Sequence, residues 1–286
     1  MSIQTENAAG RTTYQPAFKS ARPAAIKKQP TSWKSIQSWV VPVLLLAIWQ
    51  IGATAGWIPA RVLPAPTVVF HAGAELWRSG DLLRNIEISS GRALTGLLIG
   101  GSVGFLLGLI NGVWALAEGL LDSPVQMFRT IPSLALIPLV ILWLGIGEEA
   151  KVTLVALGVF FPLYLNTYHG IKTVDVNLKE MGRVYGLGPW ALFRRVIFPG
   201  ALPSIIVGLR FALGTMWLVL IGAEGLAADS GIGFMTNTAR EFMRTDIVLL
   251  GTVIYALLGK IADLFAKGLE RRFLQWHPNY GVARSS

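Results

Sequence analysis

The sequence predicts an all-α, polytopic membrane protein with about six transmembrane helices. Hydrophobic residues make up 53% of the 286 residues and charged residues only 14%, whereas about 25% charged residues is usual in soluble domains. Apolar stretches of about 20 residues, the length that crosses the hydrocarbon of a bilayer, recur along the chain. Cysteine is absent, and the three histidines lie far apart without ligand spacing. This excludes disulfides and cysteine nucleophiles, and we expect no catalytic metal centre in this chain.

The chain begins with a polar, basic segment over residues 1–37, which contains six lysines and arginines. It lacks the apolar centre and cleavage site of a secretory signal, and its composition is typical of a disordered tail. We predict a disordered cytoplasmic tail over 1–37, a transmembrane domain over 38–272 and a second cytoplasmic tail over 273–286.

The first predicted span runs from Trp39 to Trp57, with tryptophans placed to lie at the two membrane interfaces. Further spans are expected at about 93–113, 124–146, 151–169, 201–223 and 247–266. With the N-terminus inside, sixteen lysines and arginines fall in cytoplasmic segments and seven in external ones. This bias predicts that both termini are cytoplasmic, and it accounts for the net charge of +9 without nucleic acid.

The second span carries an unbroken row of glycines at a spacing of four residues. Four residues turn a helix by about 400°, so the row forms a slowly drifting groove. Such grooves let membrane helices approach closely. The groove is either a static packing surface or a moving interface that lines a pathway. Its members are Gly96, Gly100, Gly104, Gly108 and Gly112.

Prolines interrupt the third and fourth spans at Pro132, Pro138 and Pro162. Each removes a backbone donor and can kink a helix, which suits a pathway that opens and closes. Prolines are also ordinary in membrane helices. Pro132 and Pro138 are therefore candidates for lining a pathway, with ordinary kinks as the alternative.

Arg210 is the one cation that the sequence places in the middle of a span. A tight site for an anion would offer several converging donors, so we predict no tight anion site within the spans. Arg129, Glu224, Lys260 and Asp263 fall toward span ends, where we expect their charged groups to reach the interface.

The segment from Glu224 to Asp246, between the last two spans, is a candidate periplasmic gate. Gly231 and Gly233 permit tight turns, and Phe234 is large enough to close an opening. The alternative is an ordinary external loop.

A basic helical insert over about 177–199 separates the fourth and fifth spans. Asn177 followed by Glu180 predicts a capping box, and Gly186 predicts the end of a first helix. Pro189 fits the first turn of a second helix, which Pro199 is expected to end. The product is a helix–turn–helix that either docks on another protein or lies on the lipid surface as an amphipathic hairpin.

The spacing of this insert resembles the EAA signature of ABC-importer permeases. That signature runs Glu-Ala-Ala, three residues, Gly, nine residues, Ile-x-Leu-Pro, and in this sequence Met181 and Gly182 stand at the two alanines. Runs such as ISSGRAL (88–94), SGIGF (230–234) and YALLGKIADLFAKGLERR (255–272) are similar to the sulfonate/taurine/nitrate group, most of all to the aliphatic sulfonate permeases. The resemblance implies coupling to an ATPase through Glu180, Met181, Gly182, Gly186, Val196 and Pro199.

The resemblance also implies a type I ABC-importer architecture in a bacterial inner membrane. Two permease copies would form a homodimeric pathway, two cytoplasmic ATP-binding subunits would dock below, and a periplasmic binding protein would deliver an aliphatic sulfonate. The sequence has no phosphate-binding loop, because Gly259-Lys260 is followed by isoleucine and position 254 is also isoleucine. We therefore expect no cofactor and no enzymatic activity in this chain, with ATP and Mg bound by the partner subunit.

Three alternatives stay open at this point. The substrate could be taurine, nitrate or another small oxyanion. The chain could be a secondary transporter or channel that acts alone, although no row of buried carboxylates indicates a proton or sodium relay. It could also be a membrane scaffold without a pathway.

Overall fold

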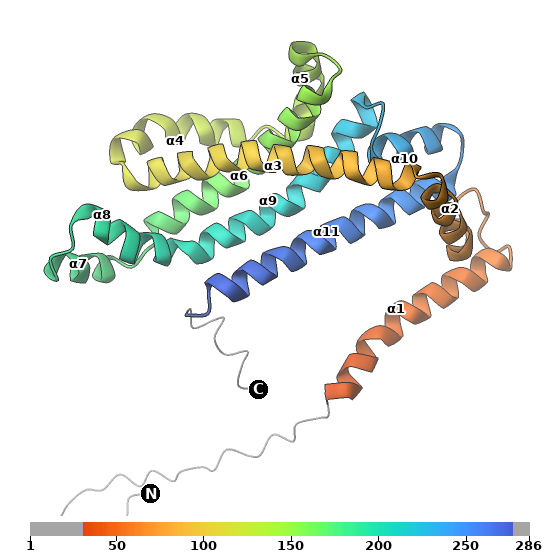
Figure 1. The fold of residues 1–286 in the computed structure, drawn as a ribbon, viewed down its shortest axis with the longest axis horizontal. Coiled ribbons are helices and arrows are strands. Elements are labelled where there is room, and N and C mark those ends of the chain that lie inside the picture. The colour runs from red at the N-terminus through yellow and green to blue at the C-terminus, as the bar shows by residue number, and fades with distance from the viewer. Residues whose placement is uncertain (1–30, 277–286) are drawn as a thin grey trace, which may run out of the picture. The chain divides into compact units, whose positions relative to one another are not determined.

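The computed structural model describes residues 31–276, and all regular structure in that range is helical (Figure 1). Most of the predicted tails, at 1–30 and 277–286, lies outside the described residues, and α1 already begins at Thr31. The chain divides into two units at Trp49, and each is described by itself. In chain order the helices are α1 (Thr31–Thr54), α2 (Pro66–Ser79), α3 (Asp81–Val113), α4 (Ala115–Arg129), η1 (Ser133–Leu136), α5 (Ile137–Leu144), α6 (Glu148–Lys172), α7 (Val176–Val184), α8 (Pro189–Leu192), η2 (Phe193–Ile197), α9 (Phe198–Ala227), α10 (Ile232–Glu241) and α11 (Thr245–Phe273).

Four of the described helices are long and apolar enough to cross a bilayer: α3, α6, α8 through α9, and α11. A fifth span is formed if the bent pair of α4 with η1–α5 counts as one. Val40–Thr54 of α1 adds a shorter apolar helix. The predicted number of about six is consistent with these segments.

The third predicted span, 124–146, is a bent pair of helices, and the bend is at one of the two prolines that predicted a kink. Helix α4 ends at Arg129, and the chain bends by 85° before η1 and α5. Pro132 lies at the break, directly before η1. Pro138 lies in the first turn of α5, where the missing backbone donor costs nothing. The two prolines therefore divide the span instead of kinking a continuous helix.

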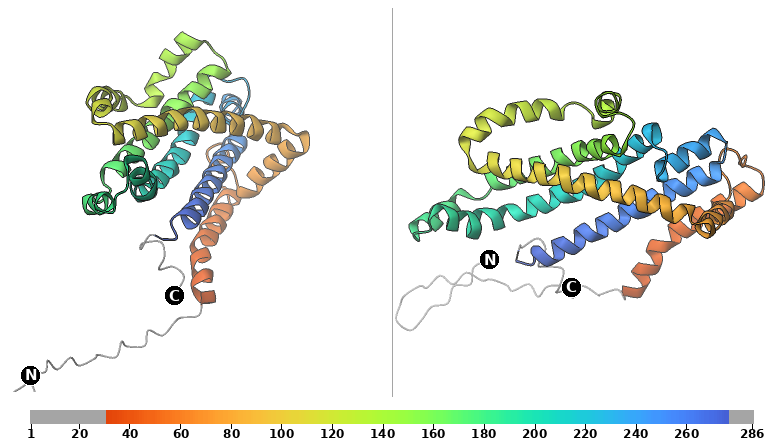
Figure 2. Two further views of the ribbon diagram at one scale, coloured as in Figure 1. Left: turned by 60° about the vertical axis from the view of Figure 1, so that its left-hand side comes forward. Right: turned by 45° about the horizontal axis from the view of Figure 1, so that its top comes forward.

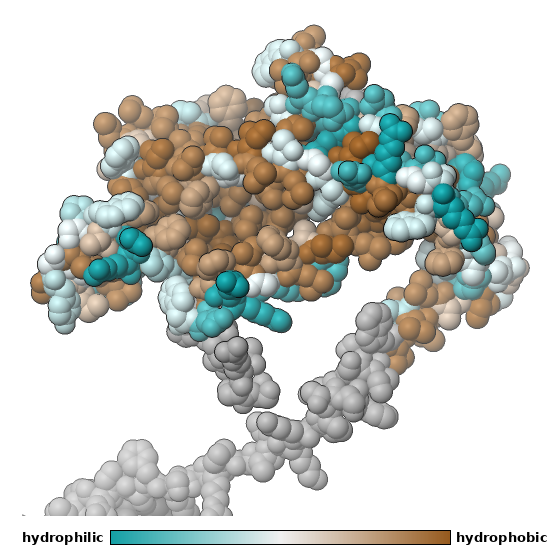
Figure 3. All heavy atoms as spheres, viewed as in Figure 1, coloured by the Kyte–Doolittle hydropathy of each residue, from teal (hydrophilic) through white to brown (hydrophobic). Residues whose placement is uncertain are grey.

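The helices of the second unit pack side by side around α6 and α9. Helix α6 lies between α3 and α9, and α11 packs on α9, α2 and α10, as the views of Figure 2 show from two sides. The core between them contains Ala93, Val155 and Leu220, all fully buried. Apolar residues gather over the middle of the long helices, whereas polar residues gather around α10 and α2 and around α7 (Figure 3). This pattern is that of helices with a lipid-facing surface.

The five glycines of the predicted groove all face α6. A Cβ built on Gly96 would lie 2.6 Å from Cγ1 of Val155. On Gly100 and Gly104 it would overlap the backbone carbonyl oxygens of Ala156 and Phe160. Gly108 and Gly112 are equally close to α6. In this conformation the row is a contact between two helix backbones, and it lines no open pathway.

Helix α4 is tied to α6 by its acidic residues. Glu118 forms an ion pair with Lys172 and accepts a hydrogen bond from Tyr168, each at 2.5 Å. Asp122 accepts from the hydroxyl of Tyr164 at 2.8 Å. The 114–123 segment has no basic residue of its own. Its Glu118 is instead paired with Lys172, at the end of α6.

Candidate functional site

The helix–turn–helix between α6 and α9 begins with a cap at Asp175. The carboxylate of Asp175 accepts a hydrogen bond from the backbone N–H of Asn177 at 2.9 Å, which satisfies a donor at the start of α7. The predicted capping box on Asn177 and Glu180 is therefore wrong, since the cap lies two residues earlier. Glu180 forms no hydrogen bond or ion pair within the described chain, and its side chain is exposed.

The turn between α7 and α8 is a complete Schellman motif. The backbone N–H of Gly186 donates to the carbonyl of Arg183 at 2.9 Å, and that of Leu187 donates to the carbonyl of Gly182 at 3.0 Å. Gly186 has φ +77°, a conformation that strains residues with a Cβ. Gly188 is extended, with φ −65° and ψ 165°, and Pro189 starts α8. The sequence predicted this turn at the right residues.

The second helix of the hairpin does not end at Pro199, contrary to the prediction. Helix α8 passes through the π-helical turn η2 directly into α9. Pro199 lies in the first turn of α9, and the N–H of Phe198 donates to the carbonyl of Phe193, five residues back. Pro199 has no backbone N–H to donate, and the π turn changes the pattern of backbone hydrogen bonds next to it so that the helix continues. The hairpin is therefore a rigid extension of a long apolar helix.

The hairpin presents apolar side chains to its surroundings. Met181 is 52% exposed, Val184 86%, Tyr185 80% and Trp190 72%. Gly182, in contrast, is buried, and a Cβ there would lie 2.6 Å from Cδ1 of Leu192. Val196 and Pro199 are half-buried. The exposed side chains of Met181, Val184, Tyr185 and Trp190 are hereafter called the hairpin face. Of these, Trp190 stacks on Phe193 and borders a hollow that residues of α3 also line.

A buried polar cluster, which the sequence did not predict, lies near the other end of α9. Its centre is Arg92 of α3, whose side chain is 3% exposed. The guanidinium binds the Glu148 carboxylate of α6 through two bonds of 2.5 and 2.6 Å. It also donates to Glu224 of α9 at 2.7 Å and to the backbone oxygen of Ser230 at 2.6 Å. Arg92 thus connects three long helices to the loop before α10.

Glu224 is the buried anion of this cluster, and it does not reach an interface as predicted. Its side chain is fully buried. Besides Arg92, it accepts hydrogen bonds from the hydroxyl of Ser89 at 2.8 Å, the N–H of Gly233 at 2.9 Å and the hydroxyl of Tyr255 at 3.1 Å. Such full pairing is what a buried charge requires.

The start of α10, the candidate gate, is held by the same side chains. Gly231 donates its N–H to Asn85 at 2.8 Å, and Ile232 donates to the Ser89 hydroxyl at 2.9 Å. Gly231 has φ +106°, a backbone conformation that favours glycine, in agreement with the predicted tight turn. Phe234 is half-buried on the first turn of α10. Helix α10 is therefore docked on α3 and α9 by its N-terminal donors.

The loop before α10 also carries an exposed acid. Asp229 is 90% exposed and lies 3.7 Å from the ammonium group of Lys151. A hydrogen bond from its own backbone N–H and, second, the charge of Lys151 lower the pKa of Asp229 below its usual value. The rim of the buried cluster is therefore charged at neutral pH.

Replacing Arg92 by methionine should leave Glu224 buried without a cation. Loss of one partner of a buried pair costs about 3–5 kcal/mol, so Arg92→Met should lower the unfolding temperature of the purified protein and increase amide exchange over α10. Arg84→Met removes an exposed arginine from the same helix and should change neither. Equal unfolding temperatures for the two variants would contradict the stabilising role of the cluster.

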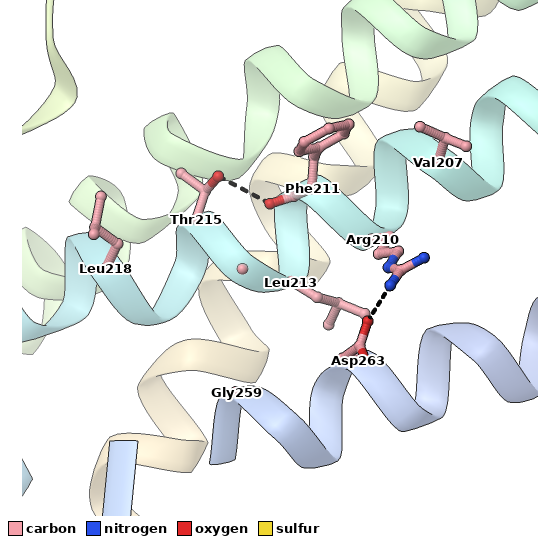
Figure 4. A pocket seen from close by; sticks show the side chains of 9 residues that line it. Val207, Arg210, Phe211, Leu213, Thr215, Leu218, Gly259 and Asp263 are labelled. Carbon is pink, nitrogen blue, oxygen red and sulfur yellow. Dashed lines mark hydrogen bonds and ion pairs between the residues drawn. The ribbon is translucent and has the colours of Figure 1, made fainter. Parts of the chain in front are cut away.

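Arg210 pairs with a neighbouring helix. Its guanidinium lies 2.7 Å from the Asp263 carboxylate of α11 (Figure 4). Asp263 thus has a partner on α9, and its predicted place at a membrane interface stays a prediction. Arg210 and Glu224 are separated by 14 residues of one helix, roughly 21 Å, so the structure does not bring Arg210 into the cluster around Gly231 and Gly233.

Pro132 and Pro138 are also apart from Arg210. They flank η1, where Leu134 packs on Gly222 of α9. A Cβ built on Gly222 would lie 2.7 Å from Cδ2 of Leu134. Within residues 31–276 no cluster of acidic or histidine side chains could hold a metal ion.

Comparison with known proteins identifies the family. The family model described as "Binding-protein-dependent transport system inner membrane component" matches residues 96–275. The chain is 54% identical over 251 residues to the putative aliphatic sulfonates transport permease protein SsuC of Escherichia coli K12, covering 88% of this chain and 95% of that protein. It is 40% identical to the SsuC protein of Bacillus subtilis 168, covering 90% and 94%. It is 34% identical to the E. coli taurine transport system permease protein TauC, covering 82% and 87%.

Solved structures share the fold at low sequence identity. An inward-facing MetNI methionine ABC transporter chain matches with a TM-score of 0.52 and 19% identity, covering 65% of this chain and 95% of that chain. A chain of an amino acid ABC transporter crystallised with histidines matches with a TM-score of 0.53 and 16% identity, covering 68% and 96%. These likenesses support the predicted ABC-importer permease architecture. With the family model covering more than half of its length, the chain belongs to the inner-membrane components of binding-protein-dependent transport systems.

Proposed function

We propose that this chain is the membrane-spanning subunit of an ATP-driven importer for aliphatic sulfonates. The observation that carries the substrate class is the 54% identity to SsuC over 88% of the chain, against 34% to the taurine permease. Two copies form the pathway, with both termini in the cytoplasm of a bacterium. A periplasmic binding protein delivers the substrate at the end that carries α10.

The hairpin of α7 and α8 is the proposed docking site for the ATP-binding subunit. An exposed apolar surface held by a cap, a Schellman turn and a continuous helix suits insertion into a groove of another protein. The side chains of the hairpin face are between 52% and 86% exposed in the described chain. Glu180 is exposed and has no hydrogen bond or ion pair within residues 31–276, so it is available to a donor of the partner. Because α8 runs directly into α9, displacement of the hairpin would move α9 as a rigid body.

The segment that contains Gly231, Gly233 and Phe234 is the proposed periplasmic gate. Helix α10 is short, and the hydrogen bonds to Asn85, Ser89 and Glu224 hold its first turn. Opening the pathway at this end would require α9 and α3 to move with α10 or to release these bonds.

Reconstituted uptake tests the proposed function. The complete complex with binding protein, ATP and Mg should import pentanesulfonate into vesicles, whereas the permease alone should not. Uptake by the permease alone would instead identify a stand-alone transporter. Uptake of taurine or nitrate without uptake of alkanesulfonates would contradict the substrate class.

A further inference from the structure

Three cations and two carboxylates meet between the middle of α9 and the C-terminal half of α11. Arg210 lies 2.7 Å from one oxygen of Asp263 and 3.7 Å from Glu270. The other oxygen of Asp263 lies 2.8 Å from the ammonium group of Lys267 and 3.8 Å from that of Lys260. The cluster therefore carries one positive charge in excess.

The Arg210 guanidinium is incompletely satisfied. Its side chain is 43% exposed, and Asp263 is its one partner within hydrogen-bonding distance in the described chain. A guanidinium has five N–H donors arranged in a fork that fits planar or tetrahedral oxyanions. Arg210 thus keeps free donors for a second anion, while Asp263 competes for the same group.

The free side of Arg210 borders an open hollow of about 640 Å³. Asp263 and Gly259 of α11 also line it, and the remaining wall is largely apolar side chains of α9, among them Val207, Phe211 and Leu218 (Figure 4). The one hydroxyl there, that of Thr215, is engaged with the carbonyl of Phe211 at 2.9 Å. A cation at one edge and a broad apolar wall beside it match an anion that carries an apolar chain.

We propose that this hollow is a weak, transient site for an alkanesulfonate on its way through the membrane. The sulfonate head binds Arg210 in exchange with Asp263, and the alkyl chain lies on Phe211 and Leu218, which are both exposed. The inference rests on the proposed function and adds the place at which the substrate is held. Exchange with Asp263 keeps the affinity low, which suits a pathway that must release what it binds.

The test uses four variants of the complete reconstituted complex, with uptake of pentanesulfonate normalised to the permease present. Arg210→Gln removes the cation but leaves Asp263 with one partner fewer. Arg210→Gln combined with Asp263→Asn removes both charges of the closest pair, and it leaves Lys267 and Glu270 with one ion-pair partner fewer each. Asp263→Asn alone removes the competitor. Arg271→Gln, an exposed position on the same helix as Asp263, is the control for loss of a positive charge.

An anion site and a structural ion pair predict opposite results for the double variant. If Arg210 binds substrate, the double variant should import about tenfold more slowly than the unsubstituted complex, as Arg210→Gln does, because a hydrogen-bonded charge contact is lost. Asp263→Asn should bind pentanesulfonate about tenfold more tightly in calorimetry. If the pair is merely structural, neutralising both partners should restore import.

Two outcomes overturn the inference and can be told apart. If the unsubstituted complex imports pentanesulfonate and the double variant matches it, the site at Arg210 is wrong and the proposed function stands. If the unsubstituted complex fails to import any alkanesulfonate, the proposed function and the site fall together. Import by the Arg271→Gln complex at the normal rate confirms that overall charge is not the cause.

Discussion

Gly100→Ala should destroy most of the folded permease, although it adds a single methyl group. A Cβ at this position would overlap the backbone of Ala156, and a backbone atom cannot rotate away as a side chain can. Overpacking typically costs about 1–3 kcal/mol and occasionally more. Because membrane helices associate without a hydrophobic driving force, separation of α3 from α6 has no compensating gain. Permease abundance in membranes and the unfolding temperature in detergent should both fall.

Gly91→Ala is the matched control, on the same helix and with the same added methyl group. No atom lies within 4 Å of a Cβ built on Gly91, and alanine is the better helix former. Its abundance and unfolding temperature should equal or exceed those of the unsubstituted protein. If Gly100→Ala behaves like Gly91→Ala, the two helix backbones are not in close contact.

Local sequence rules were enough to predict the turn between the two helices of the hairpin. Glycine at a left-handed position and proline in a first turn act within a few residues, so Gly186 and Pro189 marked the turn correctly. The cap was misplaced by two residues, because Asp175 and Asn177 are both good capping residues and only the backbone path decides between them. Pro199 was misread as a stop, since a π turn restores the hydrogen bonding that a sequence pattern treats as broken.

The cluster around Arg92 could not be predicted from local patterns. Its partners are 56 residues away at Glu148 and 132 residues away at Glu224, so only the packed fold brings them together. The sequence places Arg92 directly before the predicted span at 93–113, where an arginine can reach the interface without an acidic partner. Asp263 and Arg210 were likewise assigned separate roles until the packing of α9 on α11 joined them. A charge count assigns each cation to a side of the membrane and carries no information on which charges pair.

Gly186→Val should uncouple the permease from its ATP-binding subunit without removing it from the membrane. The backbone at this residue has φ +77°, where a β-branched side chain costs about 1–3 kcal/mol of local strain. Strain of that size is enough to unwind the last turn of α7, which has only nine residues. The spans should insert as before, because their packing does not involve this turn. The permease should then neither retain the ATP-binding subunit during purification nor import sulfonate.

Gly188→Val provides the control within the same turn. Its backbone is extended, with φ −65° and ψ 165°, which valine adopts readily before a proline. No atom lies within 4 Å of a Cβ built there.

A hairpin that lay on the lipid surface would respond differently: Gly186→Val would have little effect, and polar substitutions of Trp190 and Phe193 would weaken anchoring.

The most direct test of coupling through this hairpin is the amount of ATP-binding subunit that co-purifies with each variant, divided by the amount of permease recovered. We predict a ratio near that of the unsubstituted complex for Gly188→Val and a ratio at least tenfold lower for Gly186→Val, since 1.4 kcal/mol corresponds to a factor of ten in binding. Full retention of the ATP-binding subunit by Gly186→Val, at normal permease abundance, would contradict the account.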